Sequence, residues 1–308
     1  MVSPILPALL LDLLIGDPEK APHPVRLIGS AIERLEVFLR ARVKDETFAG
    51  GLLFGVVVTS SFLVSFIIWM SAARLHPIAG YAVNILFIYW SISIKNLGDE
   101  ALAVFKPLDE GDLESARARI SRIVGRDTKD LNETSVSKAC VETVSENFVD
   151  GVLSPLFFAL IGGGPLAITY KAINTCDSMV GYKNEKYIKF GKISAIADDV
   201  ANFIPARLSI PFITMASFLL GKDYKNSFRV GMRDRLKHPS PNAAHSEAAF
   251  AGALGITLGG ESEYGGEKSS KPVLGEGLNE PERRHIPEAI TLMRVTAIIV
   301  VALFISVS

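Results

Sequence analysis

Apolar residues are gathered along the chain in long runs, and the longest runs have the length of membrane-spanning helices. The run 47–73 contains no charged side chain, and a second run follows after a short turn at 74–77. Crossing the hydrocarbon core of a bilayer takes about 20 apolar residues in a helix. We therefore predict a transmembrane hairpin and, near the C-terminus, a third span. The predicted spans lie at 50–72, 77–94 and 289–307.

Two further apolar runs contain residues that break helices. The run 152–173 includes the sequence Gly-Gly-Gly-Pro, and the run 203–221 includes two prolines and Arg207. Such segments are either kinked spans or re-entrant hairpins. The predicted fold class is an all-α, polytopic integral membrane protein with broken or re-entrant helices and cytoplasmic helical loops.

The distribution of positive charge predicts the orientation in the membrane. Segment 16–46 carries six Lys and Arg residues, whereas the turn at 74–77 carries one. Cytoplasmic loops are enriched in these residues, so 16–46 and 95–151 are expected inside and the turn outside. We predict one membrane domain over 1–308. The Gly-, Glu- and Ser-rich stretch 259–287 is expected to be a mobile loop within it.

Composition excludes several classes of protein. The chain has 308 residues, of which 49% are hydrophobic, and its mean hydropathy of +0.31 is high for a soluble protein. With 32 basic and 33 acidic residues, it has no bulk positive field for nucleic acid, and no nucleic-acid-binding motif is present. Two cysteines exclude a disulfide scaffold and a four-cysteine metal site. Neither a P-loop nor a dinucleotide-binding glycine motif is found.

Three carboxylates recur at helical spacing just before the first interrupted apolar run. Glu142, Glu146 and Asp150 stand at i, i+4 and i+8, which places them on one face of an α-helix. Like charges at this spacing repel each other unless a cation binds there. Oxygen ligands of this kind suit Mg²⁺, so these three residues are predicted catalytic and metal-binding residues. The alternative is an acidic face that is simply washed by solvent.

Four other clusters are dense in polar side chains. In the cluster that contains His23, the neighbouring prolines restrict the backbone to a rigid turn. In the cluster 198–207, Arg207 lies within an apolar run, where a carboxylate or phosphate partner is expected. The alternative interpretations are ordinary helix caps, internal ion pairs and wet surface. The predicted residues, in chain order, are Asp17, His23 and Arg26; Asn174, Asp177, Ser178, Tyr182 and Asn184; Asp198, Asp199, Asn202 and Arg207; and Ser240, Asn242 and Glu247, with Asn147 beside the carboxylate row.

Taken together and in this order, the clusters resemble the CbiB/CobD family, the adenosylcobinamide-phosphate synthases of cobalamin biosynthesis. The resemblance covers essentially the whole chain. The stretches that carry it are GDPEKAPHPVRLIG (16–29), VETVSENFVDGVLSPLFF (141–158), YKAINTCDSMVGYKNEKYIKFG (170–191), DDVANFIPAR (198–207) and SPNAAHSEAAFAGALG with the later YGG (240–266).

The resemblance implies a multi-pass ligase of the cell membrane that uses ATP and Mg²⁺. Its substrates are expected to be adenosylcobyric acid, a corrinoid, and aminopropanol phosphate. Its expected partners are the lipid bilayer and other membrane-bound enzymes of cobalamin assembly. Because ATP is cytoplasmic, the active site is expected on that face. All five clusters should then share it, so at least one of the segments 152–173 and 203–221 is expected not to cross the membrane. His23, Arg26 and Arg207 are expected to contact phosphate or the acyl oxyanion, and Asn side chains to read the corrinoid amides. A membrane transporter and a non-catalytic corrinoid-binding scaffold remain as alternatives.

Overall fold

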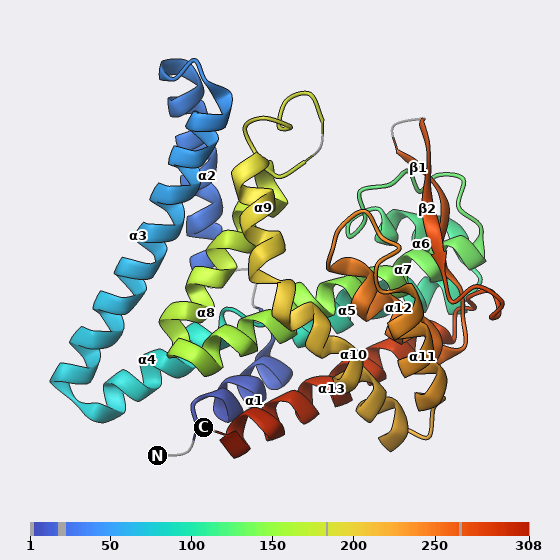
Figure 1. The fold of residues 1–308 in the computed structure, drawn as a ribbon. Coiled ribbons are helices and arrows are strands. Elements are labelled where there is room, and N and C mark those ends of the chain that lie inside the picture. The colour runs from blue at the N-terminus through green and yellow to red at the C-terminus, as the bar shows by residue number, and fades with distance from the viewer. Residues whose placement is uncertain (1–2, 18–22, 183, 265–266, 308) are drawn as a thin grey trace. The chain divides into compact units, whose positions relative to one another are not determined.

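The structure is a computed structural model that describes residues 3–17, 23–182, 184–264 and 267–307. Helices dominate these residues, and a β-hairpin is added near the C-terminus (Figure 1). Four helical runs within the described residues are long and apolar enough to cross a membrane. The predicted all-α, membrane-protein-like fold is thereby confirmed. The four runs are Glu46–Leu75, Pro77–Asp109, Glu133–Val180 and His285–Ser306.

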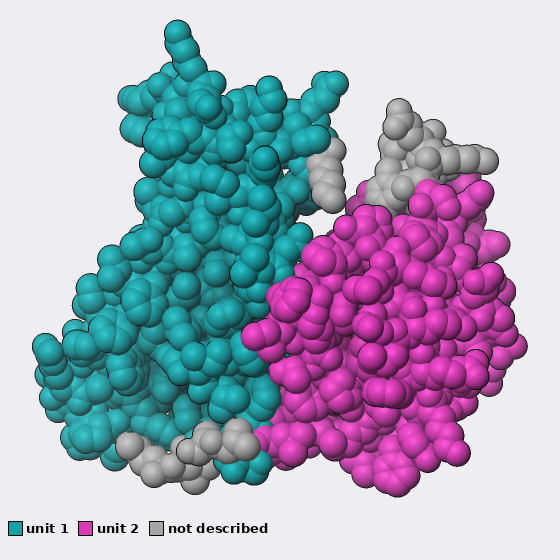
Figure 2. Space-filling model, viewed as in Figure 1, with its two compact units in different colours: residues 1–93, 150–202, 304–308 teal, residues 94–149, 203–303 magenta. Residues whose placement is uncertain are grey.

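Internal contacts divide the chain into two compact units, where the sequence predicted one domain. Unit 1 comprises residues 1–93, 150–202 and 304–308, and unit 2 comprises residues 94–149 and 203–303 (Figure 2). Unit 1 contains α1 (Ile5–Ile15), α2 (Pro24–Arg42), α3 (Glu46–Leu75), α4 (Pro77–Tyr89), the π-helical turn Val149–Leu153, α8 (Ser154–Val180) and α9 (Lys192–Ala201).

The predicted transmembrane hairpin forms helices α3 and α4. The Asp45 side chain accepts a hydrogen bond from the Phe48 N–H and so caps the start of α3. His76 ends α3, and its Nδ1 accepts from the Ile78 N–H to cap α4, which has Pro77 in its first turn. A helix of 30 residues is about 45 Å long at 1.5 Å per residue, which exceeds the hydrocarbon core of a bilayer.

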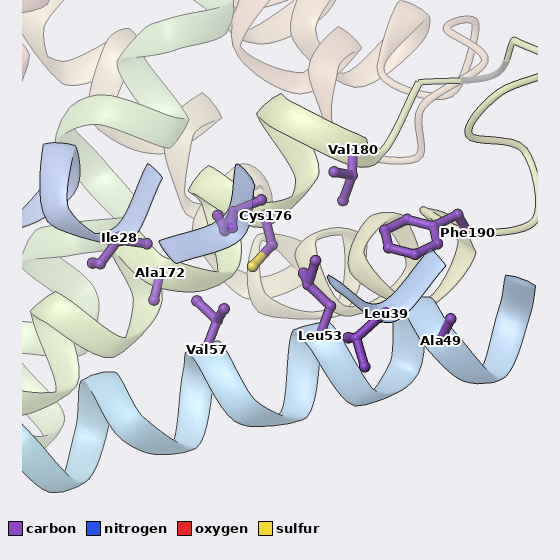
Figure 3. Close-up of a cluster of buried hydrophobic side chains, with 10 residues drawn as sticks. Ile28, Leu39, Ala49, Leu53, Val57, Ala172, Cys176, Val180 and Phe190 are labelled. Atoms are coloured by element: carbon purple, nitrogen blue, oxygen red, sulfur yellow. The ribbon is translucent and has the colours of Figure 1, made fainter. Parts of the chain in front are cut away.

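One face of α3 is buried against α2 and α8 and forms the core of unit 1. Leu53 and Val57 of α3 pack with Ile28 of α2 and Cys176 of α8, and Phe190 closes the end of this cluster (Figure 3). Only a minor part of the α3 surface is covered by the protein. The remaining apolar surface of α3 is therefore available to lipid.

Helix α4 ends early and helix α8 is broken in its middle, and in each case a hydrogen bond to a distant residue lies at the interruption. The predicted span 77–94 ends early, at Tyr89, because the Ser93 N–H bonds to the Gly151 carbonyl at 2.9 Å instead of continuing a helix. In α8, Gly162 and Gly163 leave the helical conformation, and Gly163 has φ +66°. The two halves of α8 run in different directions (Figure 1), and the Asn84 side chain accepts from the Gly164 N–H at the break.

Unit 2 is built of helices packed around α12 and of the hairpin that contacts them. The predicted segment 203–221 forms a helix of 17 residues, which is shorter than a typical span. The stretch 259–287, expected as a loop, begins with an antiparallel hairpin. The elements are α5 (Ile94–Asp109), α6 (Leu113–Ile120), α7 (Glu133–Phe148), α10 (Phe203–Leu219), α11 (Tyr224–Asp234), α12 (Ala243–Leu254), β1 (Leu258–Tyr264), β2 (Glu267–Leu274) and most of α13 (His285–Val307).

Candidate functional site

Helix α7 of unit 2 carries a buried carboxylate that is held from two sides. Glu142 is 4% exposed, and its Oε2 accepts a hydrogen bond from Arg126 Nη2 at 2.5 Å. Its Oε1 accepts from the Gly259 N–H at 2.6 Å, at the start of the β-hairpin. Both oxygens are therefore committed to protein donors, as a buried charge requires.

Two more carboxylates lie within electrostatic range of Glu142. Glu247 on α12 is 2% exposed and interacts with both Glu146 and Glu142, and with the cations Arg126 and Lys271. Its Oε1 is buried without a hydrogen-bond partner among the described residues. Burial, reinforced by the neighbouring carboxylates, raises the pKa of Glu247 well above its usual range.

The predicted row of three carboxylates does not stay together. The α-helix ends at Phe148, and Asp150 lies in a π-helical turn, in which the hydrogen bonds span five residues and the periodicity changes. Asp150 belongs to unit 1, where it interacts with Lys171. Among the described residues, no three His, Cys, Asp or Glu side chains are placed to hold a metal ion. These three residues therefore do not form such a group in the part of the chain that the structure describes, and their contact with Mg²⁺ stays a prediction.

Arg207, on α10, has neutral partners instead of the expected carboxylate. Its Nη1 donates to the Phe203 carbonyl at 2.6 Å and to Asn242 Oδ1 at 3.5 Å, and its guanidinium lies 3.3 Å from the centre of the Phe203 ring. The salt bridges of the described residues do not include Arg207. The contacts of Arg207 are thus with neutral groups, and its contact with phosphate or an oxyanion stays a prediction.

The predicted cluster of Ser240, Asn242 and Glu247 lies at the start of α12. The Asn242 N–H bonds to Ser240 Oγ at 3.3 Å, and the Ser240 N–H bonds to His238 Nδ1 at 3.0 Å. These bonds fold the chain into the turn that precedes α12. Burial, with a contribution from Arg207, lowers the pKa of His245 to about 4, so this histidine is neutral at pH 7.

Unit 1 contains a buried polar network that joins the predicted cluster 174–184 to the predicted cluster 198–207. Asn202 Oδ1 accepts from Tyr170 Oη at 2.9 Å and from Ser154 Oγ at 2.5 Å, and its Nδ2 donates to Asp198 Oδ2 at 2.9 Å. Asn174 Nδ2 donates to the other oxygen of Asp198 at 3.3 Å. Burial raises the pKa of Asp198, and the two amide donors oppose that rise. The oxygen of the Asn202 amide accepts two hydrogen bonds from the protein and its nitrogen donates to Asp198, so this side chain supports Asp198.

Lys171 places a positive charge beside this network. Its Nζ donates to Asn174 Oδ1 at 3.4 Å, and it interacts electrostatically with Asp17, Asp150 and Asp198. A lysine within a largely apolar helix is expensive unless it is partnered, and such residues generally mark functional sites. Three carboxylates, Asp17, Asp150 and Asp198, and the amide of Asn174 therefore surround this one side chain of unit 1.

His23 uses both of its ring nitrogens. Nδ1 accepts a hydrogen bond from the Val25 N–H and caps α2, so Nε2 carries the proton and faces Asp17 Oδ1 at 3.5 Å. Burial lowers the pKa of His23, although Asp17 opposes this effect. These contacts suit a positioning role for His23 better than proton transfer. Arg26, one turn along α2, is exposed.

The remaining predicted residues lie nearer the surface or bond within their own helices. Ser178 Oγ donates to the Asn174 carbonyl and Asn147 Nδ2 to the Thr143 carbonyl, and Asn184 Oδ1 accepts from the Tyr187 N–H. Their ligand contacts stay predictions. The same holds for Asp177, Asp199, which interacts with Asp198, and the exposed Tyr182.

Three charged residues of these clusters escaped the sequence prediction. Lys171 could have been found, because it is the single charge within the third apolar run, 152–173. Arg126 and Lys271 are close to the carboxylates only through tertiary structure, and each stands in a polar stretch with no local pattern. For these two residues the sequence offers no comparable signal.

Comparison with known proteins identifies the family of the chain. Residues 5–293 match the family described as CobD/Cbib protein. The chain belongs to the CobD/CbiB family. It is 46% identical over 300 residues to the cobalamin biosynthesis protein CobD of Listeria monocytogenes serovar 1/2a, covering 97% of this chain and 95% of that protein.

Other members of the CobD/CbiB family are similar over most of their length. CobD of Clostridium perfringens strain 13 is 49% identical over 273 residues, which covers 88% of this chain and 87% of that protein. CbiB of Salmonella choleraesuis is 44% identical over 302 residues, covering 97% and 95%. No solved structure matches the chain. The family match includes every cluster described above, in both units.

Proposed function

We propose that the chain is an adenosylcobinamide-phosphate synthase that acts in cobalamin biosynthesis. It joins aminopropanol, as its phosphate, to the remaining carboxylate of adenosylcobyric acid in an ATP-dependent reaction. The observation that carries this proposal is the family match over residues 5–293. It is supported by full-length relatives that are named cobalamin biosynthesis proteins.

The polar clusters supply the chemistry that an amide ligation needs. A carboxylate is a poor electrophile, so ATP activates it as an acyl phosphate before the amine attacks. This reaction requires cations for the phosphates and the developing oxyanion, and a carboxylate for the ammonium proton. Arg207 and Lys171 are proposed for the first task and the carboxylates of α7 and α12 for the second. The Asn side chains, Asn174 and Asn242 among them, are proposed contacts for the corrinoid amides.

Magnesium is proposed as the counter-ion of the ATP phosphates. Mg²⁺ in nucleotide sites usually keeps several water ligands and takes only one or two carboxylates from the protein. Because each oxygen of Glu142 already accepts a hydrogen bond, from Arg126 or from Gly259, we assign it to the support of the site. Asp150 is a candidate for one such contact.

The enzyme is proposed to be a multi-pass protein of the cell membrane with its active site on the cytoplasmic side. The four long apolar helices support membrane insertion. Cysteine-accessibility labelling at Lys186 tests the orientation, because labelling from outside the cell would contradict it.

Turnover by detergent-purified protein tests the reaction. The assay contains adenosylcobyric acid, aminopropanol phosphate and Mg-ATP, with mass spectrometry of the corrinoid. We expect an ATP-dependent mass gain that matches the new amide. Corrinoid binding without any mass gain would favour a non-catalytic scaffold.

A further inference from the structure

Glu247, which interacts with Glu146 in unit 2, has a buried oxygen with an unmet need for a hydrogen-bond donor. Glu142 is satisfied by Arg126 and Gly259, but the buried Oε1 of Glu247 has no partner among the described residues. A carboxylate is an acceptor-only group when ionised. An unpartnered buried acceptor costs free energy in the resting protein, so a ligand that brings a donor would relieve it.

The balance of charge indicates which kind of donor fits. Three carboxylates (Glu142, Glu146 and Glu247) and two cations (Arg126 and Lys271) interact in this cluster. Burial raises the pKa of Glu247, so its ionised form depends on an added positive charge nearby. Once all five are ionised, three negative charges face two positive ones and the cluster has a net charge of −1. A monovalent cation neutralises this excess, whereas a divalent ion would leave a positive surplus.

We propose that Glu146 and Glu247 bind the primary ammonium group of the amine substrate. An alkylammonium carries three donors on a compact charge and needs hydrogen bonds rather than the closely spaced ligands of a metal. Two carboxylates from α7 and α12 meet that need, although no three are placed to hold a metal ion among the described residues. This inference rests on the proposed function for the identity of the amine.

The pair also has a place for the proton that the amine must lose. The ammonium gives one proton to a carboxylate of the pair. The free amine then forms the C–N bond with the activated acyl group, the bond from the acyl carbon to the phosphate oxygen breaks, and the second nitrogen proton leaves with the phosphate. The products are the amide, a protonated Glu and hydrogen phosphate, so atoms and charges balance.

Isothermal titration of the detergent-purified full chain tests the ammonium site. The probes are aminopropanol phosphate and the isosteric propanediol phosphate, which has a hydroxyl in place of the ammonium. We expect the wild type to prefer the amine, and Glu247→Gln and Glu146→Gln to lose about 10–100-fold in amine affinity. Affinity for the propanediol phosphate should not change. Glu133→Gln, an exposed residue of the same helix α7, is the matched control.

The outcomes separate this inference from the proposed function. Retained preference for the amine in both folded variants, or no preference in the wild type, overturns the ammonium site. If the wild type binds Mg²⁺ in the absence of nucleotide and Glu247→Gln does not, the ammonium site is overturned in favour of a metal site. Ligation assays on the same samples report on the reaction: Glu-dependent amine binding without ligation would refute only the proposed function. Ligation by Glu247→Gln with unchanged KM for the amine would refute only the ammonium site.

Discussion

Removal of Arg126 should destabilise unit 2 severely by leaving a buried charge without its partner. The side chains of Arg126 and Glu142 are 10% and 5% exposed, and 2.5 Å separates their bonded atoms. Breaking a buried ion pair from one side costs about 3–5 kcal/mol, whereas replacing both partners is often nearly neutral. We therefore expect Arg126→Met to lose about 3–5 kcal/mol of stability.

Chemical denaturation of the purified protein in detergent, followed by circular dichroism, measures this loss. In the double variant Arg126→Met/Glu142→Gln, the glutamine Oε1 still accepts from the Gly259 N–H, so most of the lost stability should return. Arg119→Met, at an exposed arginine of α6, serves as control and should change stability by less than about 0.5 kcal/mol. The reasoning is refuted if Arg126→Met costs less than about 1 kcal/mol, or if the double variant is no more stable than the single one.

Three further changes probe other parts of unit 2. Because the pKa of His245 is lowered to about 4 by burial and by Arg207, its stability contribution is complete above about pH 6.5 and is lost as pH falls towards 4; His245→Gln should remove up to about 3 kcal/mol of that acid sensitivity in unfolding experiments. The raised pKa of Glu247 has the opposite sign, with stability lost as pH rises through the folded-state pKa, so thermal unfolding at pH 8 should show Glu247→Gln to be more stable than the wild type. Gly259→Ala should lower both stability and turnover, because Gly259 has φ +77° and a Cβ there would lie 2.3 Å from the Pro272 carbonyl oxygen; a turnover equal to that of the wild type would contradict this.

Hydrophobic patterning predicted the helices well because burial in lipid or protein needs only long apolar runs. The hairpin around His76 and the break in α8 at Gly162–Gly163 were both expected from local residue types. The early end of α4 was not, because it depends on a bond between Ser93 and Gly151, 58 residues apart. Local patterns thus predict where helices form and where glycine breaks them, but long-range hydrogen bonds decide some ends.

In the candidate site, too, local spacing predicted positions within one helix but not contacts that depend on the fold. Helical spacing correctly brought Glu142 and Glu146 onto the same helix α7, but it failed at Asp150, where a π-helical turn interrupts the periodicity. No rule of composition or spacing anticipated that turn. The hydrogen-bond partners of Glu142 come from distant parts of the chain. Its burial and its two hydrogen bonds could therefore be recognised only from the structure.

The β-hairpin shows why composition misjudged the stretch after α12. Its Gly, Glu and Ser residues are typical of a loop, yet β1 and β2 pair in antiparallel register with Gly260 opposite Lys271. This pairing places the Gly259 N–H and Lys271 at neighbouring positions of the hairpin, and both act on carboxylates of α7. A bulge between Leu258 and Gly260 accompanies the approach of that N–H. Gly259 is therefore required by its positive φ and by a close backbone contact, and the hairpin is part of the candidate site.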